Sequence, residues 1–116
     1  MIDLGCRDGK LEACPESSIL LIRVSGVRAP SYLAAWAEPV GPGERIWDFP
    51  GADAKMPALS IDAGTQVLPE GVRPGPVGRY RVHVLLSPRI LTRAELLAAR
   101  RDAFPAATEL NLEVVP

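Results

Sequence analysis

Apolar and polar residues alternate one by one along two stretches in the second half of the chain. In GRYRVHVLLS, residues 78–87, every second residue from Tyr80 to Leu86 is apolar, and residues 109–115 alternate in the same way. A period of two places one set of side chains on one face of a strand. The pattern predicts two strands that each turn one face to a core. It puts His83 on the opposite, arginine-bearing face, where solvent or a neighbouring strand edge is the usual environment.

The first half of the chain contains three further strand patterns. Residues 18–25 are apolar and β-branched on both faces, which is typical of a central buried strand. Residues 32–38 and 45–49 favour two strands joined into a hairpin by a turn rich in proline and glycine. The first strand of this hairpin carries Tyr32 and Trp36 on one face.

The N-terminal residues predict a hairpin that contains both cysteines. The Asp-Gly pair at 8–9 is a strong two-residue turn signal, with strands at about 2–7 and 10–14. A regular turn of this kind places Cys6 and Cys14 on opposite faces, roughly 10 Å apart along the strands, which is beyond the span of a disulfide. A disulfide therefore requires an irregular hairpin. A Cys6–Cys14 disulfide and two free thiols both remain open.

One helix is predicted near the C-terminus. Thr92 and Glu95 have the spacing of a capping box, in which each side chain binds a backbone amide at a helix start. Leucines and alanines follow, so the helix covers about residues 92–102 and precedes the last strand. Elsewhere 12 prolines and 10 glycines divide the chain into pieces too short for a helical bundle. The fold class is mainly β, an antiparallel β-sandwich of about seven to nine strands with one short helix.

Composition limits the possible partners. The chain has 116 residues, enough for one domain over residues 1–116, and its net charge of -1 gives no positive field for nucleic acid. No apolar run of about 18 residues exists, so the chain does not insert directly into a membrane. No signal-peptide pattern precedes the first strand. We expect the chain to be a domain excised from a longer protein.

The residues from Gly78 to Val84 also carry a family resemblance. The pattern Gly-x-Tyr-x-Val-x-Val before a final alternating strand resembles the penultimate strand of immunoglobulin-like and fibronectin-type sandwiches. In those folds a tyrosine hydrogen-bonds to the backbone a few residues upstream, the tyrosine corner, and Tyr80 stands at that position. The resemblance implies an immunoglobulin-like β-sandwich. The chain departs from the pattern by a helix before the last strand and by lacking the cysteine and tryptophan spacing of antibody domains.

A second resemblance concerns the order of four segments. The sequence LLIRV, then WDFP, LPEG and RYRVHV, is similar to uncharacterised sandwich domains of membrane-anchored bacterial regulators, including anti-sigma-factor-like proteins. This implies a sensing or interaction module that is extracytoplasmic, in the periplasm, and whose partner is another protein or a small ligand. It supplies no catalytic residues and no cofactor.

The residues suited to catalysis or metal binding do not form a recognisable set. His83 and Ser87 lie about 13 Å apart along one strand and cannot meet. No Gly-x-Ser-x-Gly elbow exists, and one histidine with two cysteines matches no metal-site spacing. The sequence therefore predicts a protein that is not an enzyme, with no cofactor and no metal.

The aromatic residues of the first half are the candidate ligand-binding residues. Tyr32, Trp36 and Trp47, with Asp48 beside them, lie on the two strands of the predicted hairpin. Exposed as a flat row, the rings would stack on sugars, as in a carbohydrate-binding module, or anchor a protein partner. Packing in the core is the other interpretation. A third hypothesis is a hydrolase that uses loop carboxylates such as Asp48 and Asp53.

Overall fold

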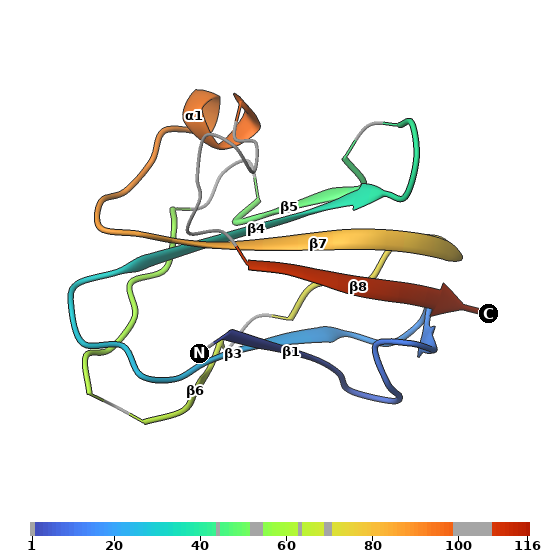
Figure 1. Ribbon diagram of the computed structural model, residues 1–116, viewed down its shortest axis with the longest axis horizontal. Coiled ribbons are helices and arrows are strands. Elements are labelled where there is room, and N and C mark those ends of the chain that lie inside the picture. The colour runs from blue at the N-terminus through green and yellow to red at the C-terminus, as the bar shows by residue number, and fades with distance from the viewer. Residues whose placement is uncertain (1, 44, 52–54, 63, 69–70, 99–107) are drawn as a thin grey trace.

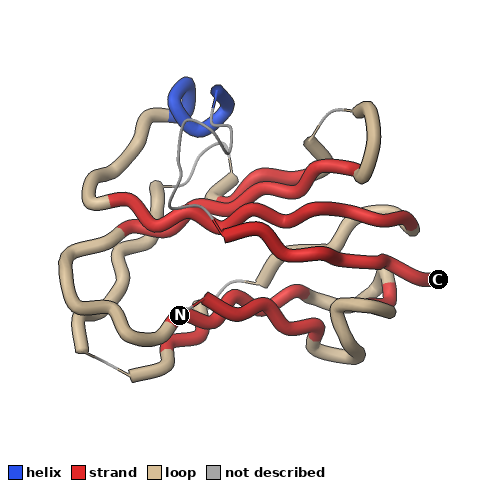
Figure 2. The backbone as a smooth tube through the Cα atoms, in the orientation of Figure 1, coloured by secondary structure: helices blue, strands red, loops and turns tan. Residues whose placement is uncertain are grey.

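The computed structural model describes residues 2–43, 45–51, 55–62, 64–68, 71–98 and 108–116. These residues form two sheets packed face to face, with strand orders β1-β3-β6 and β2-β8-β7-β4-β5 (Figures 1 and 2). Neighbouring strands are antiparallel except for β2 and β8, which are parallel. The elements are β1 (Ile2–Cys6), β2 (Cys14–Pro15), β3 (Leu20–Val24), β4 (Tyr32–Pro39), β5 (Trp47–Phe49), β6 (Gln66–Val67), β7 (Gly78–Ser87), α1 (Arg93–Ala98) and β8 (Thr108–Val115).

The fold class predicted from the sequence is confirmed: a mainly β, mostly antiparallel sandwich with one short helix before the last strand. The predicted helix begins where expected, because the Thr92 hydroxyl accepts the Glu95 N–H at 3.1 Å and the Glu95 carboxylate accepts the Thr92 N–H at 3.0 Å. Residues 99–102, the last four of that prediction, lie outside the described residues.

The main core lies between the two sheets. On β7, Tyr80, Val82 and Val84 are buried on the inner face, as the alternation predicts. The central strand of the smaller sheet, β3, also alternates, with Leu21 half-buried and Arg23 exposed on its outer face. The expectation that β3 is buried on both faces was therefore wrong, because only one sheet packs against it.

The hydroxyl of Tyr80 donates a hydrogen bond to the carbonyl of Pro76 at 2.6 Å. This bond, predicted from the position of Tyr80 in the sequence, fixes the long loop that leads into β7. The ring itself is buried in the main core, so the Tyr80 side chain links the loop to the hydrophobic core between the sheets.

The N-terminal hairpin does not form as predicted. After β1 the chain makes two successive turns, marked by backbone bridges between Cys6 and Gly9 and between Lys10 and Ala13. The following strand, β2, is only two residues long and pairs with β8 of the other sheet. The first two strands therefore belong to different sheets, since the second turn carries the chain across the side of the sandwich.

Candidate functional site

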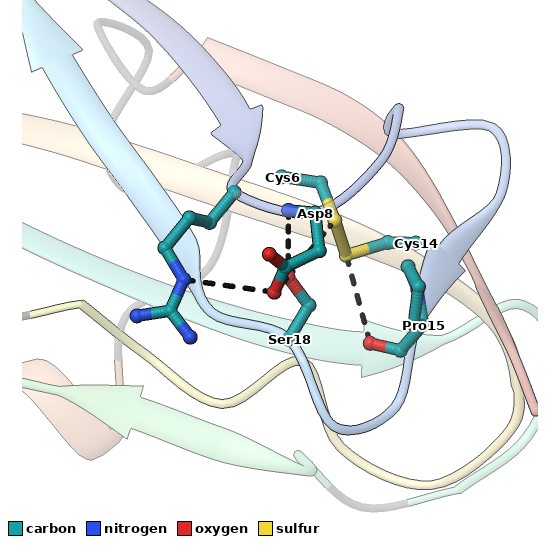
Figure 3. Close-up of a disulfide and its surroundings, with 6 residues drawn as sticks. Cys6, Asp8, Cys14, Pro15 and Ser18 are labelled. Carbon is teal, nitrogen blue, oxygen red and sulfur yellow. Dashed lines mark hydrogen bonds and ion pairs between the residues drawn. A yellow bond between two sulfur atoms is a disulfide. The ribbon is translucent and has the colours of Figure 1, made fainter.

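A disulfide between Cys6 and Cys14 joins the two sheets at one side of the sandwich (Figure 3). Cys6 ends β1 of the three-stranded sheet and Cys14 begins β2 of the five-stranded sheet, and their Cα atoms are 5.8 Å apart. The double turn between them supplies the irregular geometry that a disulfide requires here. Cys14 is fully buried in the main core and Cys6 is half-buried. The bond thus cross-links two layers that share no hydrogen-bonded strand.

A buried serine fixes the turn beside this disulfide. The Ser18 hydroxyl accepts the Asp8 N–H at 3.1 Å and donates to the Asp8 carboxylate at 3.0 Å. Its oxygen lies 3.5 Å from the Cys6 sulfur. Arg7 stands 3.5 Å from the same carboxylate, but both side chains are more than half exposed, so this ion pair contributes little. These contacts hold the turn in a shape that brings the two cysteines together.

The second feature is a small hydrophobic cluster on the outer face of the five-stranded sheet. The helix α1 lies on this face, opposite the three-stranded sheet (Figure 1). Tyr32, Ala34 and Trp36 share the outer face of β4, as the alternation predicts. The cluster comprises Ala34, Trp36, Met56, Leu85, Leu91 and Leu96, with Tyr32 at its edge.

Trp36 lies at the centre of this cluster and is 1% exposed. The His83 ring stacks on the indole with centroids 5.1 Å apart and planes inclined by 16°. The Arg45 guanidinium lies 4.7 Å from the centre of the indole. The indole thus contacts both an imidazole and a cation.

His83 is buried, with 6% exposure, which corrects the expectation of a solvent-facing or edge histidine. It does lie on the outer face of β7 and outside the main core, as predicted, but a third layer of chain covers that face. Neither ring nitrogen has a hydrogen-bond partner, and the Glu38 carboxylate is 3.5 Å from Nε2. The indole nitrogen of Trp36 also lacks a partner. Leaving a buried polar group unpaired costs about 1–3 kcal/mol.

Arg45 connects the sheet to the helix above it. Its Nη1 donates to the Asp48 carboxylate at 2.9 Å and to the Leu96 carbonyl at 2.7 Å. Arg93 donates to the Pro50 carbonyl at 3.2 Å and lies 4.0 Å from Asp48. Sequence reasoning missed Arg45, since no local pattern around it indicates that it reaches the helix 51 residues later.

The structure does not bring the predicted ligand-binding aromatics together. Trp36 pairs with Asp48 across the hairpin, and Ala37 pairs with Trp47, so the two tryptophans point to opposite faces of the sheet. Trp47 packs against the main core, whereas Trp36 and the half-buried Tyr32 belong to the outer cluster. The flat aromatic row that sugar stacking requires is not formed.

The carboxylate of Asp48 is engaged with Arg45, and Asp53 lies outside the described residues. The Ser87 hydroxyl donates to the Arg89 carbonyl at 2.7 Å. Ser87 therefore does not hydrogen-bond to His83. No group of three potential ligands among them could hold a metal ion.

The arginines at the start of β7 form ion pairs with the neighbouring strand. Arg79 lies 3.0 Å from Glu113, and Arg81 lies 3.5 Å from Glu109. A shallow cleft of about 260 Å³ opens beside the first pair, lined by Leu11, Glu12, Val40, Arg79, Tyr80, Asn111, Leu112 and Glu113. The arginines are therefore matched by acids rather than gathered into a positive patch.

The start of α1 carries a perturbed carboxyl group. The guanidinium of Arg89 hydrogen-bonds to Glu95 and lowers the pKa of Glu95 to about 2, and the Thr92 N–H contributes in the same direction. The side chain is exposed, so the effect stabilises the helix start only modestly.

A scan against protein-family models, a search of curated proteins and a search of solved structures each returned no match for this chain. Within the described residues, α1 is too short to cross a membrane, and no other helix is long and apolar enough to do so.

Proposed function

We propose that this chain is an immunoglobulin-like, non-enzymatic interaction module that binds another protein, within a larger membrane-anchored regulator of a bacterium. The observation that carries the proposal is the strand order. The order β1-β3-β6 resembles that of strands A, B and E in an immunoglobulin-type sandwich. The order β8-β7-β4-β5, with β2 beside β8, resembles that of G, F, C and C′. The Tyr80 hydrogen bond at the start of β7 supports the same correspondence. The step from this fold to an interaction function is made by analogy with other sandwich domains.

The polar residues support binding rather than chemistry. His83 stacks on Trp36, Ser87 bonds to the backbone, and the arginines of β7 pair with acids of β8. These side chains hold strands and loops in place. They do not converge on a site where a nucleophile, a base and a substrate would meet.

The disulfide supports a location outside the cytoplasm. Disulfides persist in oxidising compartments such as the bacterial periplasm and are rare in the cytosol. The Cys6–Cys14 bond lies partly in the main core, where it bridges the two sheets. Acid-quenched extraction followed by thiol alkylation reads its state in the native cell. Oxidised protein fits the proposal, and a reduced pair contradicts the periplasmic location.

Photo-crosslinking in the native cell tests the interaction function. A photoreactive amino acid is placed at Val40, Val67 or Leu97, which are each about half exposed and lie on the β4–β5 loop, β6 and α1. We expect a discrete protein adduct from one or two positions, with the silent positions as matched controls. Absence of an adduct at all three, in protein shown to be folded, would overturn the proposal.

A further inference from the structure

The segment from Arg89 to Ala98 is attached to the sheet by few contacts. Two of its side chains are buried, those of Leu91 and Leu96. The Leu91 N–H donates to the sulfur of Met56 at 3.2 Å, a weak acceptor. Other polar contacts are the bonds from Arg45 to the Leu96 carbonyl and from Arg93 to the Pro50 carbonyl, and Arg93 also lies 4.0 Å from Asp48. At the start of the segment, Ser87 hydrogen-bonds to the backbone of Arg89.

The helix within this segment does not stabilise itself. It is six residues long, and isolated helices shorter than about 12 residues are marginal in water even when rich in alanine. Its structure therefore depends on the capping box and on the packing of Leu96. The strand beneath it, β7, is paired along most of its length with β4 on one side and β8 on the other.

Closing the segment over the sheet leaves polar atoms unsatisfied. Trp36 Nε1 and both ring nitrogens of His83 are buried without hydrogen-bond partners. When the segment lifts, water or a partner can supply those bonds. Leu91 and Leu96 of the segment belong to the same cluster as Trp36, so opening lets water reach the unpaired indole nitrogen. Residues 89–98 belong to no strand, so opening breaks no strand pairing.

We propose that residues 89–98 form a lid that opens locally, while the sandwich stays folded, and so controls access to the Trp36–His83 pair. The open face presents an indole N–H donor and an imidazole, with Arg45 and Glu38 beside them. This face fits a polypeptide partner that contributes backbone carbonyl acceptors. The identity of the occupant rests on the proposed interaction function, whereas the opening of the lid does not.

Hydrogen exchange of the two indole N–H groups, followed by NMR on the isolated folded chain, tests the lid. Both groups are buried and unpartnered, but Trp47 lies on the core side of the sheet and serves as an internal control. We expect the Trp36 indole to exchange much faster than Trp47 and with little dependence on added urea, as local opening requires. Exchange of Trp36 at the rate and urea dependence of the β7 amides would overturn the proposal.

Two leucines of the helix supply matched variants. Leu96 is 7% exposed and contacts the cluster, whereas Leu97 is 53% exposed. We expect Leu96→Ala to speed Trp36 exchange by roughly thirtyfold and to leave Trp47 unchanged. We expect Leu97→Ala to change neither rate by more than about twofold. Equal acceleration of both indoles by Leu96→Ala would mean global loosening and would contradict a lid. If Leu96→Ala does not fold, the urea dependence of the unaltered chain decides the question. These measurements use the isolated chain without a partner. A negative result therefore contradicts the lid alone and leaves the proposed interaction function to the crosslinking experiment.

Discussion

Breaking the Cys6–Cys14 bond should destabilise the sandwich by an amount that can be calculated from its loop. The bond closes a loop with a sequence separation of 8. For a loop of about nine residues, the chain-entropy relation gives about 2.6 kcal/mol at room temperature. For a domain of this size, this corresponds to a fall in melting temperature of about 10 °C.

Two experiments distinguish the effect of the disulfide bond on stability from the effect of the two cysteine side chains. Urea unfolding of the chain with and without a reductant measures the bond alone, because both sulfurs remain in place. The double variant Cys6→Ser with Cys14→Ala should lose about 1 kcal/mol more, since Cys14 is fully buried and alanine leaves a small void. The m-value should stay the same if the denatured state is little changed.

A local readout accompanies the global one. The Glu16 N–H, bonded to the Val115 carbonyl, holds the end of β2 against β8. Reduction should speed exchange of this amide more than exchange of the Val82 amide in the centre of β7. The disulfide would not hold the two sheets together if its reduction lowered the free energy of unfolding by less than about 0.5 kcal/mol. Equal acceleration of exchange at the Glu16 and Val82 amides would refute that role as well.

Three further outcomes follow from single side chains. Replacement Tyr80→Phe should lower the free energy of unfolding by about 1 kcal/mol in urea unfolding, because the Pro76 carbonyl loses its donor; no change would show that water replaces the bond. The pKa of Glu95 is lowered to about 2 in the folded chain, so this group stabilises the fold at pH values above its usual pKa of 4.5. The contribution is lost as the pH falls from about 4.5 through 2. A carboxyl NMR titration of Glu95 with a midpoint near 4.5 would contradict the Arg89 contact. Replacement Trp36→Ala should cost about 3–5 kcal/mol in urea unfolding, whereas an exposed sugar platform would cost less than about 0.5 kcal/mol.

Local patterns predicted the elements whose determinants are local. The alternation around Tyr80 identifies β7 and its inner face, and the spacing of Thr92 and Glu95 places the start of α1. Each depends on residues within a few positions of one another. The hydrogen bond of Tyr80 was expected from the resemblance to immunoglobulin-like sandwiches, and it joins residues four positions apart.

Features that depend on distant segments were not predicted. The first turn is centred on Arg7 and Asp8, one residue before the predicted Asp-Gly pair, and a second turn follows it. Pairing with β8 at the far end of the chain then places Cys14 in the other sheet. Similarly, the period of two put His83 on the correct face of β7. It could not indicate that Leu91 and Leu96, from a later segment, would cover that face.

The proposed function depends most directly on the strand order, in which β1 and β2 belong to different sheets. Backbone NOEs measured by NMR around Cys14 test this order. The account predicts contacts from Cys14 and Pro15 to Val114 and Val115 in a parallel arrangement. Contacts from Cys14 to Asp3, the partner in a regular hairpin turned at residues 8–9, would contradict it.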